Sequence, residues 1–242
     1  MKKFLTCICF SFFLLGLNAQ QKIEIPGADG IKISASMYTA NDSMPYIVLC
    51  HQADYSRGEY AETAKKLNKL GYNCLAVDLR LGQEINGVVN ETAAAYKNAG
   101  KQVTHLDAEQ DIIAAIDFLY FTNERKVILM GSSYSAALAI KIGSVSNKVK
   151  AVIAYSPGDY LGTSIKLEET AKLFDKPIYL TSSKDEVSGV ISITRELKSQ
   201  NKTQFIPKGK GDHGSKVLWD SCADYPEYWY SLIMFLTELK AL

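Results

Sequence analysis

The sequence predicts an α/β protein built on a mostly parallel central sheet of about eight strands, with helices on both faces. Three observations support this prediction. From residue 30 onwards, short apolar segments alternate with longer amphipathic ones, which is typical of parallel strands joined by crossover helices. The segment 46–50 is continuously apolar, as expected of a strand covered on both faces. The 242 residues, 47% of them hydrophobic, are sufficient for one sizeable core.

The expected elements alternate along the chain. Besides 46–50, strands are expected at 31–38, 73–79, 126–130, 149–155, 177–181 and 203–206. Helices are expected at 59–70, 104–121, 135–142, 168–174, 187–198 and 225–240. Residues 80–103 form the longest irregular stretch, and such stretches are usually functional or mobile. Only residues 156–175 could form a lid, so we expect a minimal lid or none, and a fairly open site.

The first 19 residues have the pattern of a cleaved signal peptide. Lys2 and Lys3 precede a nearly unbroken apolar run at 4–17, and Leu17-Asn18-Ala19 offers a cleavage point after Ala19. The run is shorter than the roughly 20 apolar residues that span a bilayer, so we expect no stable membrane insertion after cleavage. The prediction is an exported protein, periplasmic or extracellular, with a single domain at 20–242.

Charge and cysteine content narrow the classes of function. The net charge of +1, with no cluster of lysine or arginine, argues against nucleic-acid binding. Cys50, Cys74 and Cys222 remain after cleavage, and we expect three buried thiols, with a Cys50–Cys74 disulfide as the alternative. Neither the cysteines nor the three scattered histidines have the spacing of metal ligands, so no metal site is predicted.

The pentapeptide Gly131-Ser132-Ser133-Tyr134-Ser135 lies between a buried strand and a small-residue helix. This is the setting of a nucleophile elbow, in which a sharp turn lifts a serine above the sheet. The usual pattern is G-x-S-x-G, and here Ser135 replaces the last glycine. Counting from Gly131 selects Ser133 as the nucleophile, with Ser132 as its rival. The alternative is a strand-to-helix loop with serine caps.

A serine nucleophile needs a base and an orienting acid, which follow it along the chain in this arrangement. Asp185 and His213 both lie in loops directly after predicted strands, at the sheet edge where ligands bind. We therefore expect His213 as the base and Asp185 as the acid. Asp185 could instead cap the helix beginning at Val187, and Glu186 and Asp159 are the alternative acids.

The segment His51-Gln52-Ala53 directly follows the strand 46–50, where many hydrolases carry His-Gly-x. The backbone N–H groups of Ala53 and Tyr134 are therefore expected to form an oxyanion hole. His51 itself is expected to hold this loop in place rather than to take part in the chemistry.

Together these segments, with Asp212-His213-Gly214 and Val77-Asp78-Leu79-Arg80, resemble the α/β-hydrolase superfamily, close to its dienelactone hydrolase-like branch. The resemblance covers residues 31–242. It implies the α/β-hydrolase fold, no cofactor, and a small-molecule ester substrate hydrolysed through an acyl-enzyme. Dienelactone hydrolases use a cysteine nucleophile, so Ser133 places the chain with their serine-bearing relatives. The alternatives are a peptidase or amidase with the same triad, or a non-catalytic binding protein.

Substrates of the dienelactone hydrolases carry a carboxylate, which makes Arg57 a candidate for binding an anionic substrate group. Arg57 lies four residues after Ala53, at the expected rim of the site, and a guanidinium can hold a carboxylate with two hydrogen bonds. The alternative is a surface ion pair with Glu59 or Glu62.

Overall fold

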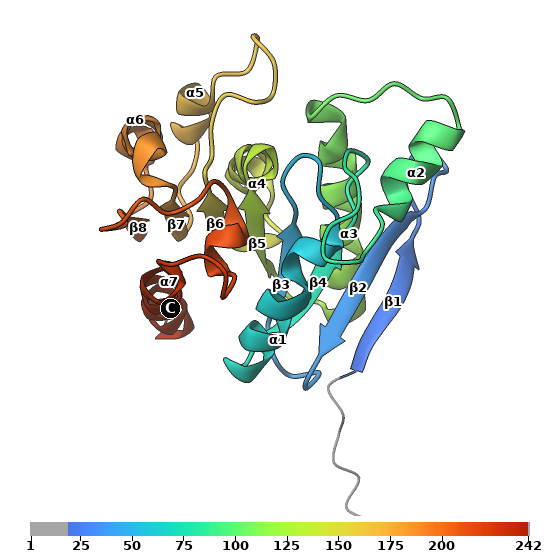
Figure 1. Ribbon diagram of the computed structural model, residues 1–242, viewed down its shortest axis with the longest axis horizontal. Helices are drawn as coiled ribbons and strands as arrows, with labels where there is room; N and C mark the ends of the chain where they lie inside the picture. Colours follow the sequence, from blue (N-terminus) through green and yellow to red (C-terminus); the bar gives the residue numbers. More distant parts are fainter. Residues whose placement is uncertain (1–18, 242) are drawn as a thin grey trace, which may run out of the picture.

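The computed structural model describes residues 19–241, so the predicted signal peptide lies outside the described residues apart from Ala19 (Figure 1). The centre of the structure is an eight-stranded sheet in the order β1-β2-β4-β3-β5-β6-β7-β8. β2 runs antiparallel to both β1 and β4, and every other neighbouring pair is parallel. The predicted mostly parallel sheet and the α/β-hydrolase fold are confirmed.

The strands are β1 Ala19–Ile25, β2 Ile33–Thr39, β3 Tyr46–Cys50, β4 Asn73–Val77, β5 Val127–Ser132, β6 Val149–Tyr155, β7 Ile178–Thr181 and β8 Lys202–Phe205. The helices are α1 Ala61–Lys69, α2 Glu91–Asn98, α3 Glu109–Asn123, α4 Tyr134–Val145, α5 Leu167–Ala171, α6 Val187–Glu196 and α7 Tyr225–Ala241. Four 3₁₀ turns complete the described part: η1 Arg57–Tyr60, η2 Leu106–Ala108, η3 Lys184–Glu186 and η4 Ser215–Leu218. No helix within residues 19–241 is long and apolar enough to cross a membrane.

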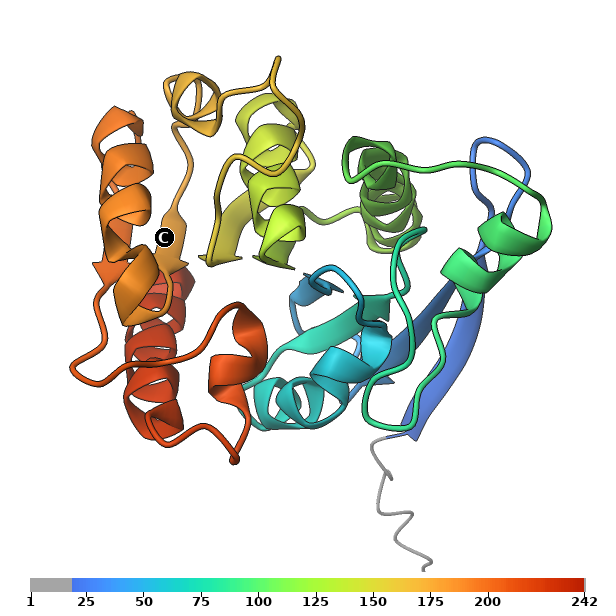
Figure 2. The ribbon, with the colours of Figure 1, turned by 45° about the horizontal axis from the view of Figure 1, so that its top comes forward.

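The helices form a layer on each face of the sheet (Figure 2). One face packs against α3, α4, α5 and α6, and the other packs against α1 and α7. Side chains alternate between the two cores along each central strand. Val48 and Cys50 of β3 enter the first core, whereas Ile47 and Leu49 enter the second. This alternation explains why the central strands are apolar throughout.

Two elements differ from the sequence prediction. β1 is an edge strand with a polar sequence, Ala-Gln-Gln-Lys-Ile-Glu-Ile, and pairs with β2 over its full length. α2 lies inside the stretch 80–103 that we expected to be irregular. Its cap is Asn90, whose side chain accepts a hydrogen bond from the N–H of Ala93 at 2.8 Å. Asparagine at this position followed by Glu91 is a helix-start signal that we did not use.

Cys50, Cys74 and Cys222 are free and buried in the described structure. The expectation of three buried thiols is confirmed, and the alternative Cys50–Cys74 disulfide is not formed. Burial raises the pKa of the Cys50 and Cys74 thiols well above the ordinary value, as expected of cysteines that act as small apolar side chains.

Candidate active site

Ser133 lies at the turn between β5 and α4, with φ 59° and ψ −122°. Few residues other than glycine adopt a positive φ, because the side chain then crowds the backbone. Gly131 makes this turn possible, since a Cβ at that position would lie 2.4 Å from the carbonyl oxygen of Ser135. These features are those of a nucleophile elbow. The rival Ser132 is fully buried, and its Oγ accepts the N–H of Ser215 at 2.8 Å.

Ser135 replaces the last glycine of the usual motif and gives the elbow a hydrogen-bonding link. Its Oγ accepts the N–H of Ser132 at 2.8 Å and lies 2.7 Å from the carbonyl oxygen of Cys50, to which it donates. Cys50 is the last residue of β3, directly before the loop expected to form the oxyanion hole. The serine therefore joins the elbow to the neighbouring strand, which a glycine could not do.

His213 follows β8 and has its Nδ1 hydrogen-bonded to a carboxylate of Glu186, not of Asp185. The prediction of Asp185 as the acid is wrong in this respect. Asp185 and Glu186 both belong to the 3₁₀ turn η3 after β7, where Asp185 is exposed and Glu186 turns inward. The alternative acid Asp159 accepts the N–H of Leu167 at 2.8 Å and pairs with a lysine instead.

Four hydrogen bonds converge on the Glu186 carboxylate. Oε1 faces His213, while Oε2 accepts from Ser156 Oγ at 2.7 Å and from Ser183 N and Oγ at 3.1 and 2.9 Å. Burial raises the pKa of Glu186, but the hydrogen bonds from His213, Ser156 and Ser183 outweigh it and lower the pKa to about 2. The carboxylate is therefore ionised at neutral pH and fixed in orientation, as the acid of a catalytic triad must be.

Tyr160 packs against the predicted base, although it belongs to no motif recognised in the sequence. It lies in the connection between β6 and α5. Burial and the charge of Glu186 raise the pKa of Tyr160, and a hydrogen bond with the Ser133 side chain lowers it. Its ring packs edge-on against His213, with 6.4 Å between centroids. No hydrogen bond joins Ser133 directly to His213 in the described structure, and Tyr160 packs against the imidazole.

The loop after β3 carries Ala53, one of the two expected oxyanion donors. Within the described structure, neither the N–H of Ala53 nor that of Tyr134 has an acceptor. His51 holds this loop, because its Nδ1 donates to Gln52 O at 2.7 Å and its Nε2 accepts Leu79 N–H at 2.9 Å. Burial lowers the pKa of His51 to about 4, so it remains neutral. The structure agrees with the expected supporting role of His51.

Glu59 lies beneath the site and is fully buried. Its carboxylate accepts the N–H of Gln52 at 2.8 Å and the hydroxyl of Ser215 at 2.6 Å. It therefore joins the oxyanion loop to the segment that follows His213. Burial raises the pKa of Glu59 to about 7, against hydrogen bonds from Ser215, Gln52 and Ser132 that lower it. No sequence motif indicated this carboxylate.

Arg57 is buried in a network of ion pairs, which contradicts its expected role in binding substrate. Its guanidinium pairs with Asp78 and, at 2.9 Å, with Glu91, and its Nε donates to Ser36 Oγ at 3.1 Å. The side chain is only 8% exposed and its guanidinium already pairs with two carboxylates, so it does not face the site as a substrate anchor. The alternative pairing with Glu59 or Glu62 is also wrong, because the partners come from the end of β4 and the start of α2.

A family model describing the dienelactone hydrolase family matches residues 33–206, which is most of the chain. The chain belongs to the dienelactone hydrolase family. The match spans β2 to the end of β8 and includes Ser133 and Glu186. The chain is therefore a hydrolase, and the residue at its strand-to-helix turn is a serine, Ser133. A comparison with curated protein sequences finds no match.

Solved structures with the same fold include esterases and a dienelactone hydrolase. An esterase from Pyrococcus furiosus is 20% identical, with a TM-score of 0.70 over 91% of this chain and 92% of that chain. A dienelactone hydrolase from Anabaena variabilis is 14% identical, with a TM-score of 0.70 over 91% and 97%. An acylaminoacyl peptidase from Pyrococcus horikoshii is 16% identical, with a TM-score of 0.67 over 90% of this hydrolase and 41% of the peptidase.

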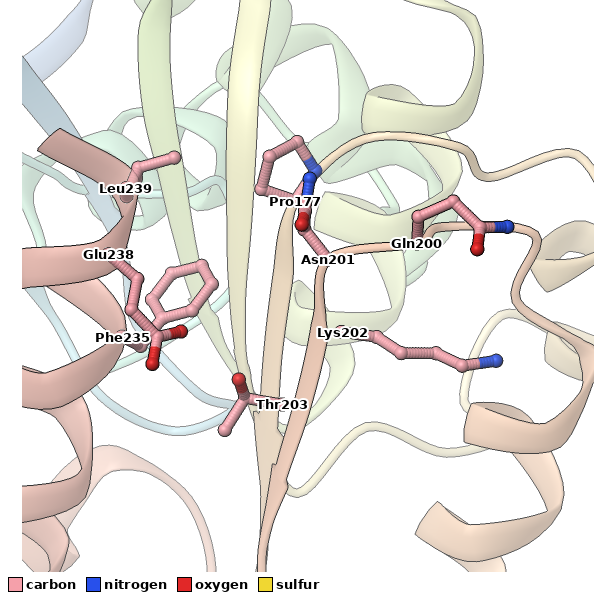
Figure 3. Close-up of a pocket in the computed structure, with 8 residues that line it drawn as sticks. All are labelled: Pro177, Gln200, Asn201, Lys202, Thr203, Phe235, Glu238 and Leu239. Carbon is pink, nitrogen blue, oxygen red and sulfur yellow. The ribbon is translucent and has the colours of Figure 1, made fainter. Parts of the chain in front are cut away.

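A cavity of about 340 Å³ lies far from this site along the strands (Figure 3). Its lining includes Pro177 and Lys202 at the amino ends of β7 and β8, and Phe235 and Leu239 of α7. Glu186 and His213 follow the carboxyl ends of these two strands. The cavity in Figure 3 is therefore separate from the candidate site of this hydrolase.

Proposed function

We propose that this protein is a serine esterase that hydrolyses small-molecule carboxylic esters through an acyl-enzyme. The observation that carries the proposal is the strained backbone of Ser133, held at the carboxyl edge of the sheet beside the His213–Glu186 pair. Strain of this kind persists only where the surrounding structure enforces it, and it is concentrated at functional sites.

In this mechanism, Ser133 Oγ attacks the ester carbonyl carbon and His213 Nε2 takes the hydroxyl proton. The carbonyl π electrons move to oxygen, where the N–H groups of Ala53 and Tyr134 stabilise the negative charge. The bond to the alkoxy group then breaks, and His213 gives the proton to the departing alkoxide. Water repeats the sequence on the acyl-enzyme and releases the acid. Glu186 orients the imidazole and stabilises its charged form.

We propose ester rather than amide hydrolysis as the main activity. The acylaminoacyl peptidase that shares the fold matches over only 41% of its length, so most of that protein has no counterpart here. We also propose export to the periplasm or the cell exterior, supported by the signal-like pattern of residues 1–19. Comparing the hydrolysis of an ester with that of the matching anilide tests the first proposal. Sequencing the N-terminus of protein secreted from the expressing cell tests the second.

The central experiment is labelling with a fluorophosphonate, which reacts only with a serine activated by a base. We expect one modified serine, Ser133, in the wild-type protein. Ser133→Ala should abolish labelling and hydrolysis of p-nitrophenyl acetate while thermal unfolding stays cooperative. Ser132→Ala is the matched control and should still be labelled. Absence of labelling in the folded wild type would contradict a catalytic serine and favour a binding protein with this fold.

A further inference from the structure

A second cavity, of about 470 Å³, lies beside the nucleophile and has no role in the mechanism above. One wall comes from the connections between β4 and α3, through Leu81 and the segment 103–106. The other wall comes from the connection between β6 and α5, through the segment 160–162. Figure 2 shows the chain leading into α3 and the segment after β6 on the same side of the sheet as α4.

Two aromatic contacts link this cavity to the candidate site. Tyr160 lines the cavity and packs edge-on against the ring of His213, with 6.4 Å between centroids. His105 lines the cavity and stacks on the ring of Tyr134, with 4.6 Å between centroids and an interplanar angle of 22°. Tyr134 is the residue whose N–H is proposed to bind the oxyanion. A group bound in the cavity would therefore be adjacent to the reacting carbon.

The lining of the cavity contains no carboxylate, lysine or arginine. Leu81, Val103, Leu106 and Leu161 supply aliphatic surface, and the first three of these are partly exposed. Several polar groups of the lining have partners already. Thr104 donates its N–H and hydroxyl to Asp107, at 2.6 and 2.7 Å, and His105 Nδ1 lies 3.2 Å from the Tyr160 carbonyl oxygen.

The arginines at this end of the sheet are engaged elsewhere. Arg80 directly precedes Leu81, but its guanidinium turns inward, with Nε and Nη2 donating to Asp111 at 2.9 and 2.6 Å. Arg57 is held by Asp78 and Glu91. A carboxylate placed in the cavity would lose hydration without meeting an arginine or lysine in the lining, whereas a hydrocarbon chain would gain from burial.

The order of the strands indicates whether the leaving group or the acyl chain of an ester can bind in the cavity. The tetrahedral carbon carries Ser133 Oγ, the oxyanion, the leaving group and the acyl chain. His213 must protonate the leaving group, and it follows β8 at one edge of the sheet. Leu81 follows β4, on the opposite side of β5 from β8, so the cavity wall formed by Leu81 and the segment 103–106 lies away from His213, whereas Tyr160 forms the wall nearer to it. The acyl chain is therefore the substituent that points towards the cavity.

We infer that the cavity between Leu81, the segment 103–106 and the segment 160–162 binds the acyl chain of the substrate, and that this chain is uncharged and apolar. The inference rests on the proposed esterase function and adds the substrate class. It also departs from the anionic substrate that Arg57 suggested from the sequence.

The first test varies the acyl chain of p-nitrophenyl esters from acetate to butyrate to hexanoate, with the leaving group unchanged. We expect kcat/KM to rise about two- to fourfold for each added CH₂ that the cavity buries. A p-nitrophenyl glutarate monoester, which ends in a carboxylate, should react at least about tenfold more slowly than the valerate of similar length. Equal rates across the series, or a preference for the glutarate, would overturn the inference.

The second test narrows the cavity with Val103→Phe. We expect hexanoate hydrolysis to lose at least about tenfold in kcat/KM while acetate hydrolysis changes less than about threefold. The matched control is Val89→Phe, because Val89 lies in the same connection but is 53% exposed and does not line the cavity. A proportional loss on both esters would overturn the inference.

A third arm holds the acyl group as acetyl and lengthens the alcohol from ethyl to hexyl. A chain-length gain that appears here, and is lost in Val103→Phe, would assign the cavity to the alcohol and overturn the acyl assignment. Failure of the esterase proposal is distinguishable, because it predicts no Ser133-dependent hydrolysis of p-nitrophenyl acetate. Normal acetate hydrolysis without the chain-length effect would overturn only the present inference.

Discussion

Replacing Glu186 with glutamine is the most direct test of the candidate triad. The change removes a negative charge but keeps the size of the side chain. The pKa of about 2, against the ordinary 4.5, corresponds to about 3.4 kcal/mol of preference for the ionised form. Because the side chain is 29% exposed, we discount this to about 2–3 kcal/mol. That preference is shared among the hydrogen bonds from His213, Ser156 and Ser183, so only part of it acts on the imidazole, and its loss should slow turnover by at least about tenfold.

The orientation of the new amide increases the loss. Oε2 of Glu186 accepts the backbone N–H of Ser183, a group that can only donate. The carbonyl oxygen of the introduced glutamine must therefore replace Oε2, which leaves its NH₂ facing Nδ1 of His213. The imidazole must then carry its proton on Nε2 and cannot accept one from Ser133. We expect kcat to fall about 10³- to 10⁴-fold in total.

The matched control is Asp185→Asn, the same chemical change one residue earlier. Asp185 is exposed, and in the described structure its side chain accepts no hydrogen bond, so we expect kcat within about twofold of wild type. Both variants should be assayed on p-nitrophenyl butyrate at pH 8, with thermal unfolding measured alongside. A wild-type rate for Glu186→Gln together with a severe loss for Asp185→Asn would refute the assignment.

Two further predictions concern buried charges. Glu59 has a folded-state pKa of about 7, raised above the unfolded value, so the free energy of unfolding should fall by about 3 kcal/mol as the pH rises from 4.5 through 7. Urea unfolding at pH 5 and 8 measures this fall. In Glu59→Gln the free energy of unfolding should change less between the two pH values, whereas the exposed control Glu62→Gln should show the wild-type change. A wild-type change in Glu59→Gln would contradict the reasoning. Arg57→Ala should reduce the free energy of unfolding by about 3–5 kcal/mol, because it leaves Asp78 buried without its partner. Its kcat/KM should change equally on neutral and carboxylate-bearing esters, and a selective loss on the anionic ester would restore the substrate-binding role.

The parts of the fold that were predictable from sequence are those buried on both faces. The bounds of β3 and β6 agree with the prediction to the residue, because a strand inside two cores must be apolar throughout and ends where polar residues begin. β1 was missed because an edge strand can be polar. α2 was missed because it is short and depends on remote contacts. Its cap Asn90 also donates to the carbonyl oxygens of Tyr55 and Leu79, 35 and 11 residues away.

Remote partners also explain the wrong prediction for Arg57. The sequence suggested that Arg57 lies at the rim of the site, but its side chain turns into the protein towards Asp78 and Glu91, 21 and 34 residues along the chain. No local pattern indicates such a pairing. The carboxylate Glu59 was missed for the same reason, because Ser215 lies 156 residues away in the sequence.

The acid Glu186 is a different case from Arg57 and Glu59, because the sequence did contain a local signal for it. Ser183-Lys184-Asp185-Glu186 has the S-x-x-E pattern of a capping box, and the structure forms that box. We predicted Asp185 as the acid and gave helix capping by Asp185 only as the alternative, whereas the capping box begins at Ser183 and includes Glu186. In the capping box, Glu186 bends back to the N–H of Ser183 through Oε2, which leaves Oε1 free for His213. Glu186 therefore completes the capping box with Ser183 and also orients His213. The same side chain that helps to start this turn is the one placed to be the acid.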